Sequence, residues 1–198
     1  MLLRKAHRII GIVLLIPLLA WALTGLIFFL KPGYAAAYEM LAPKTYPLVD
    51  QVPIKAQANW LEFRCIRTVL GNHLLVRTAE GWTNLDPVTL QPRPTPAEGE
   101  LRTLLKDAFS SNPTRYGEIV SVSGNTAKTN TGVEVSLDWN RMSLQQKGTD
   151  TDRIDLLYKI HYLQWTGQKS LDRVVGLIGI ALVLVLTTLG ALLAFKRG

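Results

Sequence analysis

Two long uncharged runs constrain the fold of this chain more than any other feature of its sequence. Residues 9–30 contain no charged side chain, and residues 174–195 contain none either. Each run has 22 residues. At about 1.5 Å of rise per helical residue, that length is enough to cross a hydrocarbon core of about 30 Å. The sequence therefore predicts a transmembrane helix at each of the two positions.

The charged residues indicate on which side of the membrane the rest of the chain lies. Five of the 22 Lys and Arg residues lie in the terminal tails, before the first run or after the second, whereas all 15 acidic residues lie between the runs. The segment between the runs is therefore only weakly basic, at +2. The net charge of +7 is thus no sign of a nucleic-acid partner. Basic tails at the outer ends of both spans are typical of the cytoplasmic side. We expect residues 1–8 and 196–198 to be cytoplasmic and the middle to be periplasmic, in a bacterial inner membrane.

A cleaved signal peptide is the alternative interpretation of the first run. The basic start and the small residues Ala35, Ala36 and Ala37 fit that pattern. However, the apolar run is longer than the roughly 7–15 residues of a signal peptide's hydrophobic region. We expect the first helix to be retained.

The segment between the spans divides into a linker, a domain and a second connection. Residues 31–55 contain several prolines and no periodicity, so we interpret them as an extended linker. Residues 56–151 are predicted to form a small α+β domain, and residues 152–173 an interfacial helix (152–165) with a connector. Within the domain, apolar alternation and turn residues predict strands at 61–69, 73–78, 82–85, 119–123, 127–130 and 133–138, and amphipathic spacing predicts a helix at 96–110.

One weak internal sequence repeat suggests that the domain contains two similar hairpins. Residues 81–86, followed by Thr-Leu-Gln at 89–91, resemble residues 132–138, followed by Ser-Leu-Gln at 143–145. Each copy is a strand that ends in Leu-Asp and a turn, which is common strand-ending chemistry.

Three short motifs together resemble the PepSY-associated transmembrane family. They are Ala6–Gly11 with Leu23–Gly25 in the first helix, Leu85–Pro87 in the domain, and Leu157–His161 with Trp165–Gly167 before the second helix. The resemblance implies a PepSY-like periplasmic domain and kinship with bacterial inner-membrane ferric and ferric-siderophore reductases. In those larger relatives, four helices hold two b-type haems through histidines near opposite membrane faces. This chain differs because it has two helices and one histidine near each face.

His7 is the candidate haem ligand near the cytoplasmic face. Gly11 follows one helical turn later on the same face of the helix, where a missing side chain leaves room for a flat macrocycle. Arg4 and Arg8 are placed to bind carboxylates such as haem propionates. The alternative is that His7 simply contacts lipid headgroups among these basic residues.

His161 is the candidate ligand near the opposite face, flanked by Tyr158, Tyr162 and Trp165. Its alternative role is that of a residue in an interfacial aromatic belt. Two histidines separated by something like the ~30 Å hydrocarbon thickness cannot bind one iron. Two-histidine ligation therefore requires a homodimer with two haems, one held by the His7 pair and one by the His161 pair. The third histidine, His73, is assigned no role.

These expectations lead to two competing functions. In the first, the dimer carries electrons through haem b to periplasmic Fe(III) or a ferric siderophore. In the second, the chain is a non-enzymatic PepSY accessory subunit anchored beside a larger membrane complex. No GxGxxG, CxxCH, CxxC or HExxH motif occurs, and Cys65 is the sole cysteine, so the sequence offers no nucleotide, covalent-haem or structural-zinc signature.

Overall fold

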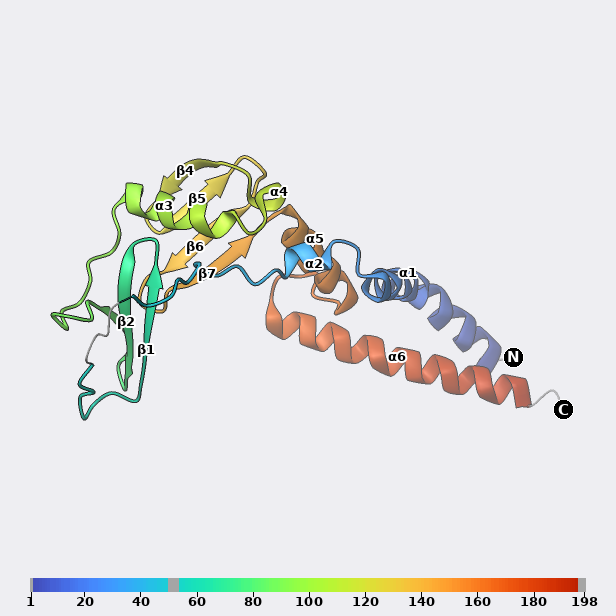
Figure 1. Ribbon diagram of the computed structural model, residues 1–198. Coiled ribbons are helices and arrows are strands. Elements are labelled where there is room, and N and C mark those ends of the chain that lie inside the picture. Colours follow the sequence, from blue (N-terminus) through green and yellow to red (C-terminus); the bar gives the residue numbers. More distant parts are fainter. Residues whose placement is uncertain (1, 50–53, 196–198) are drawn as a thin grey trace. The chain divides into compact units, whose positions relative to one another are not determined.

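The chain forms two compact units, one of helices and one α+β domain (Figure 1). The computed structural model describes residues 2–49 and 54–195, so the predicted tail 196–198 lies outside the described residues. The helical unit comprises the described residues up to Tyr34 and from Thr151 onward, and the domain comprises Ala35–Asp150. The domain thus includes most of the segment that we interpreted as a linker.

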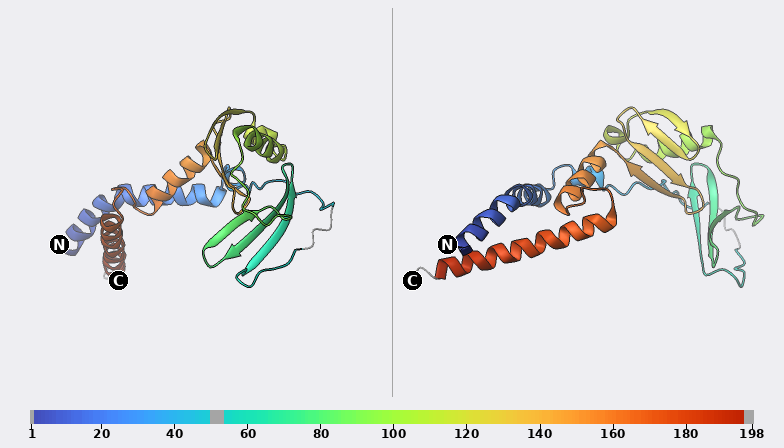
Figure 2. Two further views of the ribbon diagram at one scale, coloured as in Figure 1. Left: turned by 90° about the vertical axis from the view of Figure 1, so that its left-hand side faces the viewer. Right: turned by 180° about the vertical axis from the view of Figure 1, so that it is seen from behind.

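The helical unit contains α1 (Leu2–Leu30), α5 (Thr149–His161) and α6 (Lys169–Phe195). In Figure 1 and in the right-hand view of Figure 2, α1 and α6 run in opposite directions, and the start of α1 lies near the end of α6. Both helices are long and apolar enough to cross a membrane, and almost none of their apolar surface is buried within the protein. That exposure differs from the buried face of a core helix in a soluble protein. The predicted layout of two long apolar helices flanking an α+β domain is confirmed.

The turn between α5 and α6 is closed by a buried carboxylate. Asp172, in the first turn of α6, accepts hydrogen bonds from the backbone N–H and the hydroxyl of Thr166, at 2.9 and 2.8 Å. A negative charge near a helix N-terminus is also favourable to the helix dipole. The α5 helix begins three residues before the predicted start and ends at His161, because the chain turns at Leu163, whose φ is +55°.

The domain is built on two antiparallel sheets in which each strand pairs with its neighbour in sequence. The first sheet contains β1 (Glu62–Thr68), β2 (Gly71–Thr78) and β3 (Gly81–Leu85), and the second contains β4 (Ile119–Ser123), β5 (Thr126–Thr129), β6 (Glu134–Asp138) and β7 (Ser143–Lys147). Two short helices complete it, α2 (Tyr34–Ala37), shared with the helical unit, and α4 (Pro113–Tyr116).

The core of the domain lies between α3 (Glu98–Phe109) and the second sheet. Leu101, Leu104 and Leu105 of α3 are fully buried, and alternate residues of β6, Val135 and Leu137, face them across the core. The helix begins two residues after the predicted start, because the Glu100 carboxylate accepts the backbone N–H of Ala97 and so caps the N-terminus there.

Arg115 joins the beginning and the end of the domain. Its guanidinium donates to Asp150 (Nη1–Oδ2 2.6 Å) and to Gln146 (Nε–Oε1 2.7 Å), and Glu39 lies 4.0 Å away. Gln146 in turn donates to the backbone carbonyl of Glu39 at 2.6 Å. We call these four residues the Arg115 clamp. Its arginine side chain is only 8% exposed, so the ion pair is shielded from water.

Candidate functional site

The end of α5 brings His161 against one face of α1. The imidazole stacks on Trp21, with ring centroids 5.4 Å apart, and lies roughly perpendicular to the ring of Phe28, with centroids 5.0 Å apart. Its Nδ1 lies 2.8 Å from the hydroxyl of Thr24, which is itself buried. Tyr158, one turn earlier on α5, stacks on Phe28 at 4.7 Å. His161 is therefore held by three side chains of α1, those of Trp21, Thr24 and Phe28, rather than lying free at a surface.

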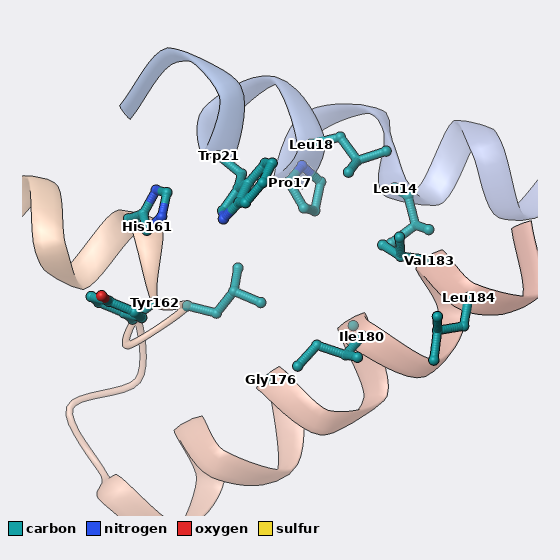
Figure 3. A pocket seen from close by; sticks show the side chains of 12 residues that line it. Leu14, Pro17, Leu18, Trp21, His161, Tyr162, Gly176, Ile180, Val183 and Leu184 are labelled. Atoms are coloured by element: carbon teal, nitrogen blue, oxygen red, sulfur yellow. The ribbon is translucent and has the colours of Figure 1, made fainter. Parts of the chain in front are cut away.

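A cavity of about 440 Å³ extends from this histidine between α1 and α6 (Figure 3). His161 and Tyr162 lie at one end of it, and Trp21 forms part of the α1 wall. The remaining lining is apolar or glycine: Leu14, Pro17, Leu18, Leu163, Gly176, Gly179, Ile180, Val183 and Leu184. This volume lies within the range of roughly 300–1,000 Å³ that is usual for small-molecule and cofactor sites.

His7 lies near the other end of the helix pair, on the face of α1 that meets α6. A methyl group at Gly190 would lie 3.2 Å from Nε2 of His7, and one at Gly11 would lie 3.7 Å from Leu186. The imidazole thus packs over a position on α6 that has no side chain. Arg4 and Arg8 are exposed, and among the described residues neither forms an ion pair.

The structure does not bring the two candidate haem ligands, His7 and His161, together. His7 and Thr24, the partner of His161, are 17 positions apart on one continuous helix, which corresponds to about 25 Å. One chain therefore presents two separate single-histidine sites.

His73 belongs to the domain and stabilises it. It is fully buried in β2, where its Nε2 lies 3.0 Å from Thr68 Oγ1 and its Nδ1 lies 3.3 Å from Asn84 Oδ1. Burial, reinforced by the positive charge of Arg93, lowers the pKa of His73 to about 4. Among the described residues, no group of three or more His, Cys, Asp or Glu side chains could hold a metal ion.

Sequence reasoning missed the neighbours of His161 on α1 and the neighbour of His7 on α6. Trp21, Thr24 and Phe28 follow i, i+3, i+7 spacing, and Tyr158, His161 and Tyr162 follow i, i+3, i+4, so each set shares one helix face. Two facing aromatic stripes were therefore visible in the sequence. No sequence pattern predicted the contact between His7 and Gly190, because this contact depends on how α1 and α6 are aligned along their lengths.

The fold and the site together define a class of protein: an α+β domain inserted between two helices that are long and apolar enough to span a membrane, with a histidine-lined cavity between those helices. Comparisons with protein-family models, with curated proteins and with solved structures find no match to this chain.

Proposed function

We propose that this chain is a two-pass inner-membrane haem b protein that carries electrons to ferric iron in the periplasm. Both termini are cytoplasmic, and the domain is periplasmic. The exposed apolar surfaces of α1 and α6 support insertion, since water would contact these surfaces otherwise. The basic residues near the helix ends support the orientation.

The contact between Thr24 and His161 is the observation that carries the proposal. Iron-binding histidines usually have their second ring nitrogen fixed by a hydrogen bond. Nδ1 of His161 has such a partner, whereas in the described part of the chain no hydrogen bond engages Nε2. The same imidazole borders an apolar cavity of cofactor size. These residues fit a haem.

The second site would be formed by His7, whose imidazole packs over Gly190 of α6. Arg4 and Arg8 would bind the haem carboxylates. Because the two histidine sites lie about 25 Å apart along α1, a second histidine for each iron must come from another copy. A two-fold homodimer supplies it at both sites.

The haem would supply one-electron transfer, and its reduction potential would depend on ligation and burial. The chain's own residues orient the imidazole, exclude water with the aromatic rings of Trp21 and Phe28, and keep the two sites at opposite ends of α1. Fe(III) or a ferric siderophore is the proposed acceptor. The resemblance to the PepSY-associated transmembrane family, which implies kinship with ferric reductases, is the reason for this choice.

Absorption spectra of the detergent-purified dimer, from cells supplied with haem, test the proposal. We expect two haems per dimer in the wild type and one in either His7→Ala or His161→Ala. His73→Gln, in the other unit of the chain, serves as the matched control and should retain both. A wild-type protein without a Soret band, or full haem content in both membrane variants, would contradict the assignment.

A second function, that of an accessory subunit, is favoured by one feature of the domain. Strand β1 is an edge strand. Phe63 on this strand is 44% exposed, and its ring centroid lies 5.8 Å from that of Trp60. Exposed aromatic side chains on a strand edge are suited to binding another protein. A protein that purifies without haem but together with a membrane complex would support this function instead.

A further inference from the structure

The hydroxyl of Thr24 has three neighbours but only one proton. Its Oγ1 lies 2.7 Å from the carbonyl oxygen of Ala20 and 3.0 Å from that of Trp21, both in its own helix. The third neighbour is Nδ1 of His161, at 2.8 Å. A carbonyl oxygen can only accept a hydrogen bond, so the hydroxyl proton must be donated to one of the two carbonyls. Donation to the carbonyl four residues earlier is the usual behaviour of threonine within a helix.

The position of that proton determines which nitrogen of His161 is protonated. With its only proton directed to a carbonyl, Oγ1 can only accept from the imidazole, so Nδ1 must carry a hydrogen. In the opposite arrangement Thr24 would donate to Nδ1. The lone pairs of Thr24 Oγ1 and of the Ala20 carbonyl oxygen would then face each other at 2.7 Å without a proton between them. In the neutral imidazole Nε2 is then the nitrogen with a free lone pair.

The surroundings of the ring prevent a simple exchange of the two nitrogens. Trp21 covers one face of the imidazole, and the rings of Phe28 and Tyr162 lie roughly perpendicular to it, at centroid distances of 5.0 and 5.3 Å. Gly25 lies beside Cε1, where a methyl group would be 3.9 Å away. A ring flip would have to displace these neighbours.

We infer that Thr24 is a positioning residue: its hydroxyl selects the Nδ1–H tautomer of His161 and so makes Nε2 the nitrogen available to iron. The tautomer follows from hydrogen bonds within the chain alone. Only the last step, the binding of iron by Nε2, rests on the proposed function.

Nitrogen-15 NMR of the full chain, labelled at histidine and kept in detergent without haem above pH 7.5, tests the tautomer. The His161 signals are assigned by their loss in His161→Gln. We expect a protonated Nδ1 and an unprotonated Nε2 in the wild type and in Thr24→Ser, which keeps the hydroxyl. In Thr24→Val, which replaces the hydroxyl by a methyl group, the signals should move towards the Nε2–H form.

Thr187→Val is the matched control, because Thr187 also donates to the carbonyl four residues earlier, at 2.9 Å, but in the described part of the chain forms no hydrogen bond to a histidine. Its spectrum should equal that of the wild type. An Nε2–H tautomer in the wild type, or an unchanged tautomer in Thr24→Val, would overturn the inference. The wild-type spectrum decides this even if the valine variant does not fold.

Haem titration then tests the last step. Loss of a hydrogen bond to a metal-binding histidine typically lowers affinity by roughly 10- to 100-fold, so we expect that loss in Thr24→Val and affinity near wild type in Thr24→Ser. Equal affinity in both variants would overturn the role of Thr24 in iron binding. The Nδ1–H tautomer in a chain that binds no haem would support the tautomer and overturn the proposed function.

Discussion

A single buried histidine makes the stability of the domain depend on pH. His73 has no access to solvent, and its pKa is lowered to about 4 from the usual 6.5. The folded domain therefore resists protonation of this imidazole, whereas the unfolded chain accepts the proton at the ordinary pKa. The stabilisation is fully present above pH 6.5 and is lost as the pH falls towards 4.

We predict that the free energy of unfolding of the domain falls by about 2 kcal/mol between pH 7 and pH 5 through this residue. Protease susceptibility of the full-length protein in increasing urea measures it. The variant His73→Asn should lose this part of the pH dependence, while His7→Gln should retain it. Parallel pH profiles for the wild type and His73→Asn would show that the histidine does not titrate as inferred.

At the scale of elements, the connection from α4 to β4 requires a glycine. Gly117 has a φ of +57° and a ψ of −137°, a conformation that is accessible almost only to glycine. A methyl group there would also collide with the side-chain oxygen of Asn130, which accepts the backbone N–H of Glu118. Both the turn and the packing therefore exclude a side chain.

We predict that Gly117→Ala lowers the free energy of unfolding by about 2–6 kcal/mol, the sum of a backbone cost and a collision. Gly124→Ala is the matched control. That glycine has a φ of +55° but no neighbour within 4 Å, so we expect a loss of only about 1–2 kcal/mol. The same urea and protease measurement compares them, and equal losses would contradict the role of Asn130.

Local patterns predicted most elements because each pattern lies within one segment. The strands β1–β6 and helix α3 lie where alternation and amphipathic spacing placed them, within two or three residues at their ends. Strand β7 was missed because Ser143, Gln145 and Gln146 give it little apolar alternation. The internal sequence repeat was a partial indication of this strand. Residues 143–145, at the end of the second copy, lie in β7. At the end of the first copy there is only an isolated bridge, between Leu85 and Pro92.

The candidate site was less predictable, because it depends on contacts between helices. The hydrogen bond between Thr24 and His161 joins positions 137 residues apart, so no local pattern could predict it. Gly11 was expected beside His7, and it does share a face of α1 with it. However, the glycine directly opposite the imidazole is Gly190 on α6. Whether His7, His161, Gly11, Arg4 and Arg8 bind haem stays a prediction.

At the scale of the whole molecule, the proposed topology can be tested with the sole cysteine. Cys65 lies on β1 and is partly exposed, although burial raises the pKa of its thiol, so labelling at pH 8 is appropriate. We predict that a membrane-impermeant maleimide labels Cys65 in intact spheroplasts. Lys5→Cys in a Cys65→Ser background should be labelled only after the membrane is permeabilised. The reverse pattern would mean that the orientation is inverted.

The Arg115 clamp has a consequence for the origin of such a chain. Glu39 and Asp150 lie near the first and last residues of the domain, and both contact the same guanidinium. Domains whose chain ends lie close together tolerate insertion into another structure. A gene encoding a two-helix hairpin could therefore acquire or lose this domain in one recombination event, with each part keeping its own internal contacts.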